Sequence, residues 1–335
     1  MANVSYTFSD TWTTKGSEVT DAHFGVNSLF HRNNYDQNSN FADVVNAVGS
    51  SVIRFPGGTI SEWYFDPANP NATGSNVDAV AGITTETITI EAGITDFLNY
   101  SAATGSDPVI VLPTWRYFDT NTRALSATAE AEIRSFVSDL ADHSLQTVGT
   151  NVDISAIEIG NEYYKQEYTW TPEEFGALSA AIADIVNDEL GTAPTQVFVQ
   201  AGATNAEDQL IRAQFDNNDL ANIDGLISHL YVTNSNGVAM NVGGGAGREL
   251  SWINSNWDTD TNNLDILVSE WNVGEDSSTF SEISGLERSA GLMRTFYEMI
   301  EHGVDMATIW TADSATTNSA LSLDQAGSPL LTPTG

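Results

Sequence analysis

The sequence predicts a (β/α)8 barrel, the TIM-barrel architecture, from three observations. Eight short apolar runs rich in β-branched residues recur along the chain, and helical patterns lie between most of them. The length of 335 residues fits one barrel of this kind better than two equal domains. A doubly wound parallel sheet is the alternative, but the chain lacks a glycine-rich phosphate-binding fingerprint, which disfavours it.

The eight apolar runs are the expected barrel strands. Each is short and mostly apolar, as is typical of parallel strands that are buried on both faces. In chain order they are Ala22–Asn27, Ser51–Phe55, Val109–Trp115, Ile154–Glu162, Gln196–Gly202, Asp224–Tyr231, Asp265–Asn272 and Met306–Ala312.

Six longer stretches have helical periodicity: Phe41–Gly49, Glu91–Thr104, Ala127–Val148, Pro172–Leu190, Glu207–Asn217 and Phe280–His302. The fourth has the clearest start, because Thr171 can cap it, Pro172 suits its first position and Glu174 completes a capping box. Two of the eight units look irregular. After the sixth run, a glycine-rich segment (243–247) leaves only a short helix near Glu249–Asn254, and no helix is expected after the eighth.

We expect the barrel to span residues 22–320, with a short N-terminal strand extension at 1–21 and a C-terminal tail at 321–335. The first residues have neither the basic nor the apolar region of a signal peptide, and no apolar run is long enough to span a membrane. A trimmed N-terminus and a secretion signal elsewhere are both compatible with this start.

The charge balance limits the partners. There are 45 acidic and 11 basic residues, a net charge of −34, so neither nucleic acid nor an anionic membrane is an expected partner. The charge suits an extracellular or secreted protein in salty or calcium-rich water, and we expect a monomer.

Cysteine is absent, which excludes disulfides and thiolate chemistry. The five histidines lack metal-ligand spacing, so neither a catalytic metal nor an organic cofactor is expected.

Two glutamates stand at the ends of predicted strands. Glu162 ends the fourth run and Glu270 lies near the end of the seventh, and these strands face each other across a barrel mouth. Hydrolysis of a glycosidic bond needs such a pair: one carboxyl donates a proton and the other is ionised. A separation of about 5–5.5 Å predicts retention of configuration, and about 6.5–9.5 Å predicts inversion. Alternatively, each glutamate caps a helix or pairs with Arg54.

These strand ends resemble the signature of clan A retaining glycoside hydrolases. The resemblance rests on Gly160-Asn161-Glu162 and Ser269-Glu270-Trp271-Asn272, and four further strand-end positions fit it: Arg54, His229, Tyr231 and Trp310. It implies that Glu162 is the acid/base and Glu270 the nucleophile. Tyr231 would orient Glu270, and Arg54 would keep it ionised.

The same resemblance implies sugar contacts. Asn161 would bond the sugar 2-hydroxyl, and His229 and Trp310 would line the subsite of the cleaved sugar. Trp115 is either part of that subsite or ordinary core.

Three families within the clan share parts of this pattern. Arg54–Thr59 followed by Phe65-Asp66-Pro67 is similar to the heparanase and β-glucuronidase family, and Arg54–Gly58 also resembles the α-L-arabinofuranosidases. Ser269–Asn272 resembles the β-xylosidase and iduronidase family. The sequence departs from these families after the eighth run, where relatives commonly carry a final helix and a β-sandwich.

Several of the few cations fall on loops of the predicted active face. One interpretation is recognition of an anionic glycan that contains uronate or sulfate, for which Arg116 and Lys165 are candidate contacts. The other is that the cations hold acidic loops together. The residues are Arg32, Arg54, Arg116, Arg123, Lys165 and Arg248.

Three further acidic features have alternative interpretations. Ser61-Glu62-Trp63 repeats the tripeptide around Glu270, but we expect it in a surface loop. Glu158 is expected to be a buried partner of Arg54. The segment 258–265 has acidic spacing reminiscent of a calcium loop, although a solvated acidic loop is the simpler interpretation.

Taken together, the sequence predicts a retaining glycoside hydrolase that cleaves a poly- or oligosaccharide, with an anionic glycan as one substrate class. The alternatives are a catalytically silent carbohydrate-binding barrel, and an α-L-arabinofuranosidase or β-xylosidase that acts on neutral glycan.

Overall fold

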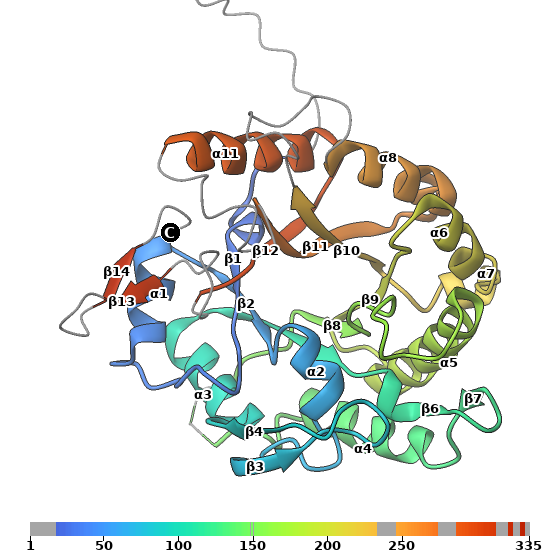
Figure 1. Cartoon of the computed structure of the whole chain (residues 1–335), viewed down its shortest axis with the longest axis horizontal. Coiled ribbons are helices and arrows are strands. Elements are labelled where there is room, and N and C mark those ends of the chain that lie inside the picture. Colours follow the sequence, from blue (N-terminus) through green and yellow to red (C-terminus); the bar gives the residue numbers. More distant parts are fainter. Residues whose placement is uncertain are drawn as a thin grey trace, which may run out of the picture.

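The eight predicted strands form one closed, all-parallel barrel in the order β1-β12-β11-β10-β9-β8-β5-β2 (Figure 1). This computed structural model describes residues 18–147, 149, 151–232, 246–273, 286–312, 321–323 and 329–331. The barrel strands are β1 (Gly25–Asn27), β2 (Val52–Phe55), β5 (Asp107–Leu112), β8 (Ala156–Ile159), β9 (Gln196–Gln200), β10 (Gly225–Val232), β11 (Asp265–Val273) and β12 (Met306–Ile309). The predicted fold class is therefore confirmed.

The interior of the barrel changes from apolar to polar along the strands. Because side chains alternate between faces, positions two apart on a strand point the same way. One cluster of interior side chains is apolar: Val52, Val109, Ala156, Phe198, Ile227, Leu267 and Met306. Two residues further toward the carboxyl ends, on five of these strands, stand Arg54, Glu158, Gln200, Ser269 and Thr308, all buried. The polar network thus rests on an apolar layer.

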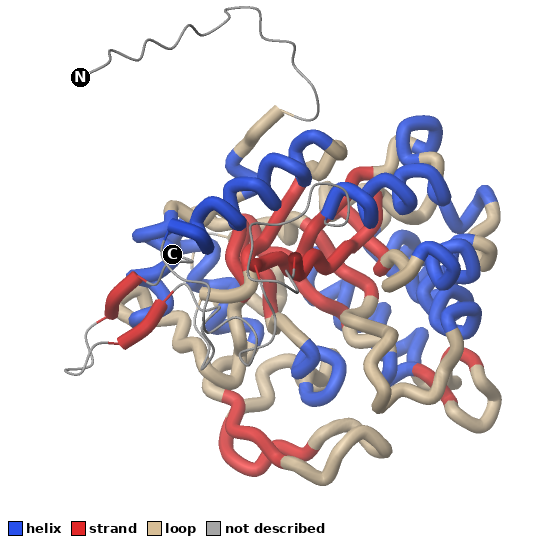
Figure 2. The backbone as a smooth tube through the Cα atoms, turned by 45° about the horizontal axis from the view of Figure 1, so that its top comes forward, coloured by secondary structure: helices blue, strands red, loops and turns tan. Residues whose placement is uncertain are grey.

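Helices surround the strands on the outside (Figures 1 and 2). They are α1 (Asn40–Val48), α3 (Ile94–Thr104), α4 (Ala129–Ala141), α5 (Pro172–Leu190), α6 (Asn205–Arg212), α7 (Asn217–Leu220), α8 (Ala246–Trp257), α9 (Thr259–Asn262) and α11 (Leu286–Glu301). The predicted capping box of α5 is present, since Thr171 Oγ1 accepts from the Glu174 N–H and Glu174 accepts from the Thr171 N–H.

Short elements decorate the loops. They are the 3-10 turns η1 (Asp21–His23) and η2 (Trp115–Tyr117), the helix α2 (Thr59–Tyr64), and the strand pairs β3 (Gly74–Asp78) with β4 (Thr87–Ile90) and β6 (Phe118–Asp119) with β7 (Ala124–Leu125). Of these, α2 matters most for the site, because it follows β2 directly.

Three helix predictions need correction. The unit after β10 carries a helix of 12 residues rather than a short one, because Leu250, Ile253 and Trp257 form a fully buried stripe at helical spacing. The helix expected to reach Val148 ends at Ala141, where the Asp142 side chain accepts from the Ser144 N–H. The helix expected over Glu207–Asn217 ends at Arg212 as α6, and Asp216 caps a separate short helix, α7, by accepting from the N–H groups of Asn218 and Asp219.

The ends of the chain are described only in part. Most of the predicted extension at 1–21 lies outside the described residues, and Asp21 begins η1. In the predicted tail, β13 (Leu321–Leu323) and β14 (Pro329–Leu331) form an antiparallel pair beside α1 (Figure 1). The described residues after β12 contain no helix, as expected for the last unit. Within the described ranges, no helix is long and apolar enough to cross a membrane.

Candidate active site

Arg54, near the end of β2, organises the barrel mouth although it is fully buried. Its guanidinium donates to both oxygens of Glu158 at 3.0 and 2.9 Å, to Asn161 Oδ1 at 2.8 Å and to Glu270 Oε1 at 2.7 Å. It also donates to Asn27 Oδ1 at 3.0 Å. Burial alone would lower the pKa of Arg54, but Glu158 and Glu270 raise it, so the cation persists. The predicted pairing of Arg54 with Glu158 is present.

Glu270 is held at both carboxylate oxygens. Arg54 donates to Oε1, and the Tyr231 hydroxyl donates to Oε2 at 2.8 Å. The side chain is 3% exposed. The ladder between β10 and β11 shifts register after Ser228, and such irregularities re-aim the side chains that follow. The carboxylate is therefore oriented and faced by a positive charge.

Glu162 lies beyond the end of β8 on a turn in the left-handed region. Gly160 has φ +89° and Glu162 itself has φ +50°, an uncommon value for a residue with a side chain. Three side chains donate to its carboxylate, two of them at Oε2: Thr59 and Lys165 at 3.0 Å each, and Tyr164 to Oε1 at 2.9 Å. Burial would raise the pKa of Glu162, but His229 and Lys165 hold it below its usual range.

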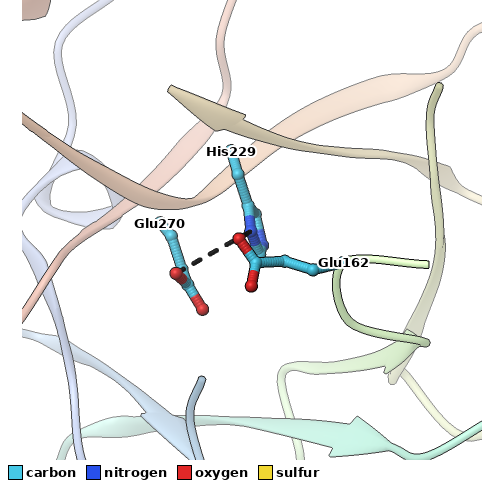
Figure 3. A group of neighbouring side chains, drawn as sticks. All are labelled: Glu162, His229 and Glu270. Carbon is cyan, nitrogen blue, oxygen red and sulfur yellow. Dashed lines mark ion pairs between the residues drawn. The ribbon is translucent and has the colours of Figure 1, made fainter. Parts of the chain in front are cut away.

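His229 of β10 lies beside both glutamates (Figure 3). Its Nδ1 is 3.5 Å from Glu162 Oε1 and 3.8 Å from Glu270 Oε2, while Nε2 is 3.1 Å from Ser269 Oγ. Burial would lower the pKa of His229, but Glu270 and Glu162 raise it. One ligand atom from each of the three residues lies within 4.8 Å of the others, so these residues could hold a metal ion. One carboxylate oxygen of Glu162 therefore lies within 4.8 Å of one carboxylate oxygen of Glu270.

Of the other residues predicted to contact the sugar, Trp310 lies at the barrel mouth, whereas Trp115 and Arg116 contact other parts of the protein. Trp310 lies at the barrel mouth, half-buried, and its ring packs so closely on Gly58 that a Cβ there would lie 2.5 Å from the indole. Trp115 is only 6% exposed and packs against Tyr168 and Trp170, so it belongs to the hydrophobic core and not to the surface of the cleft.

Arg116 holds a neighbouring loop of the protein, which is the second of the two interpretations of the cations. Its Nε donates to the Phe65 carbonyl at 3.2 Å and its Nη1 lies 3.6 Å from Asp66. Arg123 likewise pairs with Glu174 and with the Thr169 carbonyl. Arg32 and Arg248 are exposed.

The expectation of a surface loop around Glu62 is wrong. Glu62 lies in α2 and is fully buried, and its carboxylate accepts from the backbone N–H groups of Thr114, Trp115 and Asn161. Burial raises the pKa of Glu62 to about 7, although these hydrogen bonds oppose the shift. Sequence reasoning judged Glu62 by its distance from a strand, but α2 folds back over the barrel mouth.

Sequence reasoning also missed residues that contact the two glutamates or Arg54. They are Asn27, Thr59 and Tyr164. Their positions carried a signal, since Asn27 ends the first predicted strand, Thr59 follows the glycine pair after β2 and Tyr164 comes two residues after Glu162.

The acidic segment 258–265 leads into β11 at the end of that strand away from Glu270. Asp258, Asp260 and Asp265 are absent from the groups of acids and histidines with metal-ligand spacing among the described residues. Asp265 instead accepts from Gln196 at 2.8 Å. A cavity of about 680 Å³ borders this segment, but it lies at the start of β11, whereas Glu270 lies near the other end of that strand.

The fold is that of clan A glycoside hydrolases, so the predicted resemblance is confirmed at the level of architecture. No protein-family model matches the sequence, and no curated protein is similar to it in sequence. Several solved structures share the fold at low identity.

One is the GH51 arabinofuranosidase from Xanthomonas axonopodis pv. citri, with 13% identity and a TM-score of 0.68, over 96% of this chain and 72% of that one. The thermostable GH51 α-L-arabinofuranosidase from Thermotoga petrophila RKU-1 has 14% identity and a TM-score of 0.69, over 96% and 69% of the chains. A 4-O-α-L-rhamnosyl-β-D-glucuronidase from Fusarium oxysporum 12S has 14% identity and a TM-score of 0.55, over 88% and 64%.

Proposed function

We propose that the protein is a retaining glycoside hydrolase in which Glu270 is the nucleophile and Glu162 the acid/base. The observation that carries this proposal is the convergence of two buried glutamates from opposite sides of the barrel mouth. Their nearest carboxylate oxygens lie within 4.8 Å, which supports the short separation of about 5–5.5 Å between carboxyl groups that retaining enzymes use.

In the first step, Glu270 attacks the anomeric carbon. A C–O ester bond forms to the sugar, the glycosidic C–O bond breaks, and the leaving oxygen takes a proton from Glu162. Arg54 and Tyr231 support this role, because they hold the two oxygens of Glu270 and keep it ionised. In the second step, Glu162 takes a proton from water, the water oxygen bonds to the anomeric carbon, and the ester C–O bond breaks, which restores the Glu270 carboxylate and releases the sugar.

The proton of the first step needs a source, because His229 and Lys165 lower the pKa of Glu162 in the free protein. His229 is the candidate source, because its ordinary pKa of 6.5 lies closest to neutral pH among the neighbours of Glu162, and its Nδ1 is 3.5 Å from Glu162 Oε1. The pair holds one proton, which moves to Glu162 as charge develops on the leaving oxygen. After the ester forms, the low pKa of Glu162 suits its role as a base.

A neutral glycan is the better-supported substrate class, with an α-L-arabinofuranoside as the first candidate. Three of the six cations of the predicted active face are occupied by the protein's own groups, since Arg54, Arg116 and Arg123 pair with acids. Several structures of the same fold carry the name arabinofuranosidase.

An anionic glycan is the second candidate, and Lys165 is the observation that favours it. This ammonium lies beside Glu162 and its side chain is 30% exposed, so a uronate or sulfate on the substrate could reach it. We further propose that the reaction needs no organic cofactor or metal and that the protein works outside the cell.

The test is sugar release from aryl α-L-arabinofuranosides, β-xylosides and β-glucuronides and from neutral and acidic polysaccharides, with wild type beside Glu270→Gln. We expect release by wild type and a loss of more than about 1,000-fold in the variant. Proton NMR of the first product distinguishes retention from inversion. A wild type that binds these glycans without cleaving any would support the binding-only barrel instead, and an active Glu270→Gln would refute the assignment.

A further inference from the structure

Glu62 is a buried carboxylate that the proposed reaction does not use. It is 0% exposed, and both of its oxygens accept hydrogen bonds. Oε1 accepts from the Asn161 N–H at 2.9 Å and from Thr114 Oγ1 at 3.0 Å, while Oε2 accepts from the N–H groups of Thr114 at 2.8 Å and Trp115 at 2.9 Å. The carboxylate therefore ties α2 to the ends of both β5 and β8.

Every one of these partners is a donor, which explains why the residue is a glutamate. A carboxylate offers only acceptors, whereas a glutamine would present its NH2 group to at least one N–H. Hydrogen bonds to an ionised acceptor are also stronger than neutral ones. The site is thus built for a carboxylate and would be disturbed by its amide.

The backbone that Glu62 holds is the one that aims Glu162. Asn161, whose N–H binds Glu62, directly precedes Glu162, and Glu162 has φ +50°. Non-glycine residues keep such a conformation only where their surroundings enforce it. Thr59, on the same helix as Glu62, donates to Glu162 Oε2 at 3.0 Å. Helix α2 therefore holds Glu162 both through the preceding peptide and through the carboxylate.

We propose that Glu62 is a positioning residue, which fixes the turn at Gly160-Asn161-Glu162 so that the Glu162 carboxyl faces the leaving oxygen. This inference rests on the proposed function, since it assigns Glu62 to the proton-donating half of that reaction. If the inference is correct, a substitution at Glu62 impairs proton donation by Glu162 more than nucleophilic attack by Glu270.

The experiment compares substrates that differ only in their leaving group. Two series of glycosides of the sugar released in the panel are used: aryl glycosides of acidic phenols, which depart without a proton, and alkyl glycosides, whose alcohols need one. For Glu62→Gln we expect kcat/KM to fall about 100-fold on the alkyl series, as for a small misplacement of a catalytic group, and less than about tenfold on the acidic phenols. Glu91→Gln removes the same charge from an exposed residue and should change neither.

The outcomes separate the two proposals. A loss of equal size on both series, or no loss, overturns the role of Glu62. A silent wild type or an active Glu270→Gln refutes the proposed function instead. If circular dichroism shows that Glu62→Gln does not fold, Glu62→Asp provides the same comparison, because it keeps the charge and withdraws it by one methylene. It should show the same dependence on the leaving group, and its absence there also overturns the role.

Discussion

Glu162 and Glu270 are the same residue type in the same cleft, but their neighbours differ. Arg54 and Tyr231 hold Glu270 at its two oxygens, with the guanidinium fixed in turn by Glu158. Glu162 faces groups that can change their protonation or position, namely His229 and the partly exposed Lys165. A fixed cation suits a group that must stay ionised, whereas a titratable neighbour suits a group that must gain and lose a proton.

The hydrogen bond from Tyr231 to Glu270 can be tested by removing one oxygen. Tyr231→Phe should lower kcat by about 10- to 100-fold, because a hydrogen bond to a charged group contributes about 1.5–3 kcal/mol. Steady-state kinetics on the best aryl glycoside measures this. Tyr100→Phe is the matched control, since the buried Tyr100 hydroxyl has no hydrogen-bond partner among the described residues, and it should leave kcat unchanged. Equal effects in the two variants would contradict the prediction.

The position of His229 predicts the alkaline side of the pH profile. Glu270 and Glu162 raise the pKa of His229 above its ordinary 6.5, despite burial, so the proton is bound below that raised pKa and lost as pH rises through it. In His229→Asn, Glu162 alone must hold the proton, and the alkaline limb of kcat/KM should move to lower pH by about one unit or more.

The control for this profile is His143→Asn, because His143 follows the C-terminal end of α4, outside the barrel, and pairs with the exposed Asp153. Its profile should match wild type. An alkaline limb that stays in place in His229→Asn would show that His229 does not supply the proton.

Single elements of the barrel are determined by local signals of different strength. Helix α5 combines a capping box, proline at its first turn and an apolar face, and its bounds match the predicted ones. Helix α8 has its buried stripe but starts next to a glycine-rich segment, which concealed it. Caps and turns mark where an element starts, and buried periodicity marks how far it continues.

The contribution of the α5 cap to stability can be tested by a substitution at Thr171. Thr171→Ala removes the side-chain acceptor for the Glu174 N–H and should lower the free energy of unfolding by about 1 kcal/mol. Denaturant unfolding measures this. Thr192→Ala, at an exposed position that caps no helix, should change the stability by less than about 0.5 kcal/mol. A loss at Thr192 as large as that at Thr171 would mean that capping is not the cause.

At the scale of the whole molecule, the net charge of −34 opposes folding, because the compact state brings like charges together. Raising the salt concentration from about 0.1 M to about 1 M shortens the Debye length from about 10 Å to about 3 Å. We therefore expect the melting temperature to rise with sodium chloride. Sucrose at equal osmolality controls for general stabilisation, and a melting temperature that falls or stays constant in salt would contradict the prediction.

The sequence by itself determined the barrel and the residue types at its mouth. Strand and helix periodicities are local, so the eight runs and the glutamates that follow two of them could be identified without knowledge of contacts. The pairing of Arg54 with Glu158 was also predictable, because side chains alternate along a strand and both residues take positions that face the inside of the barrel.

Only the tertiary structure decided the roles of the loop residues. Glu62, Thr59 and Arg116 all lie in segments that follow barrel strands, yet Glu62 is buried and accepts from the Asn161 N–H, Thr59 contacts Glu162 and Arg116 pairs with Asp66. Loops have no periodicity to reveal which side faces inward, and their partners come from other strands. Those partners meet only when the barrel closes, which is why the two glutamates, Arg54 and Tyr231 could be predicted from the chain, whereas the contacts of Glu62, Thr59 and Tyr164 could not.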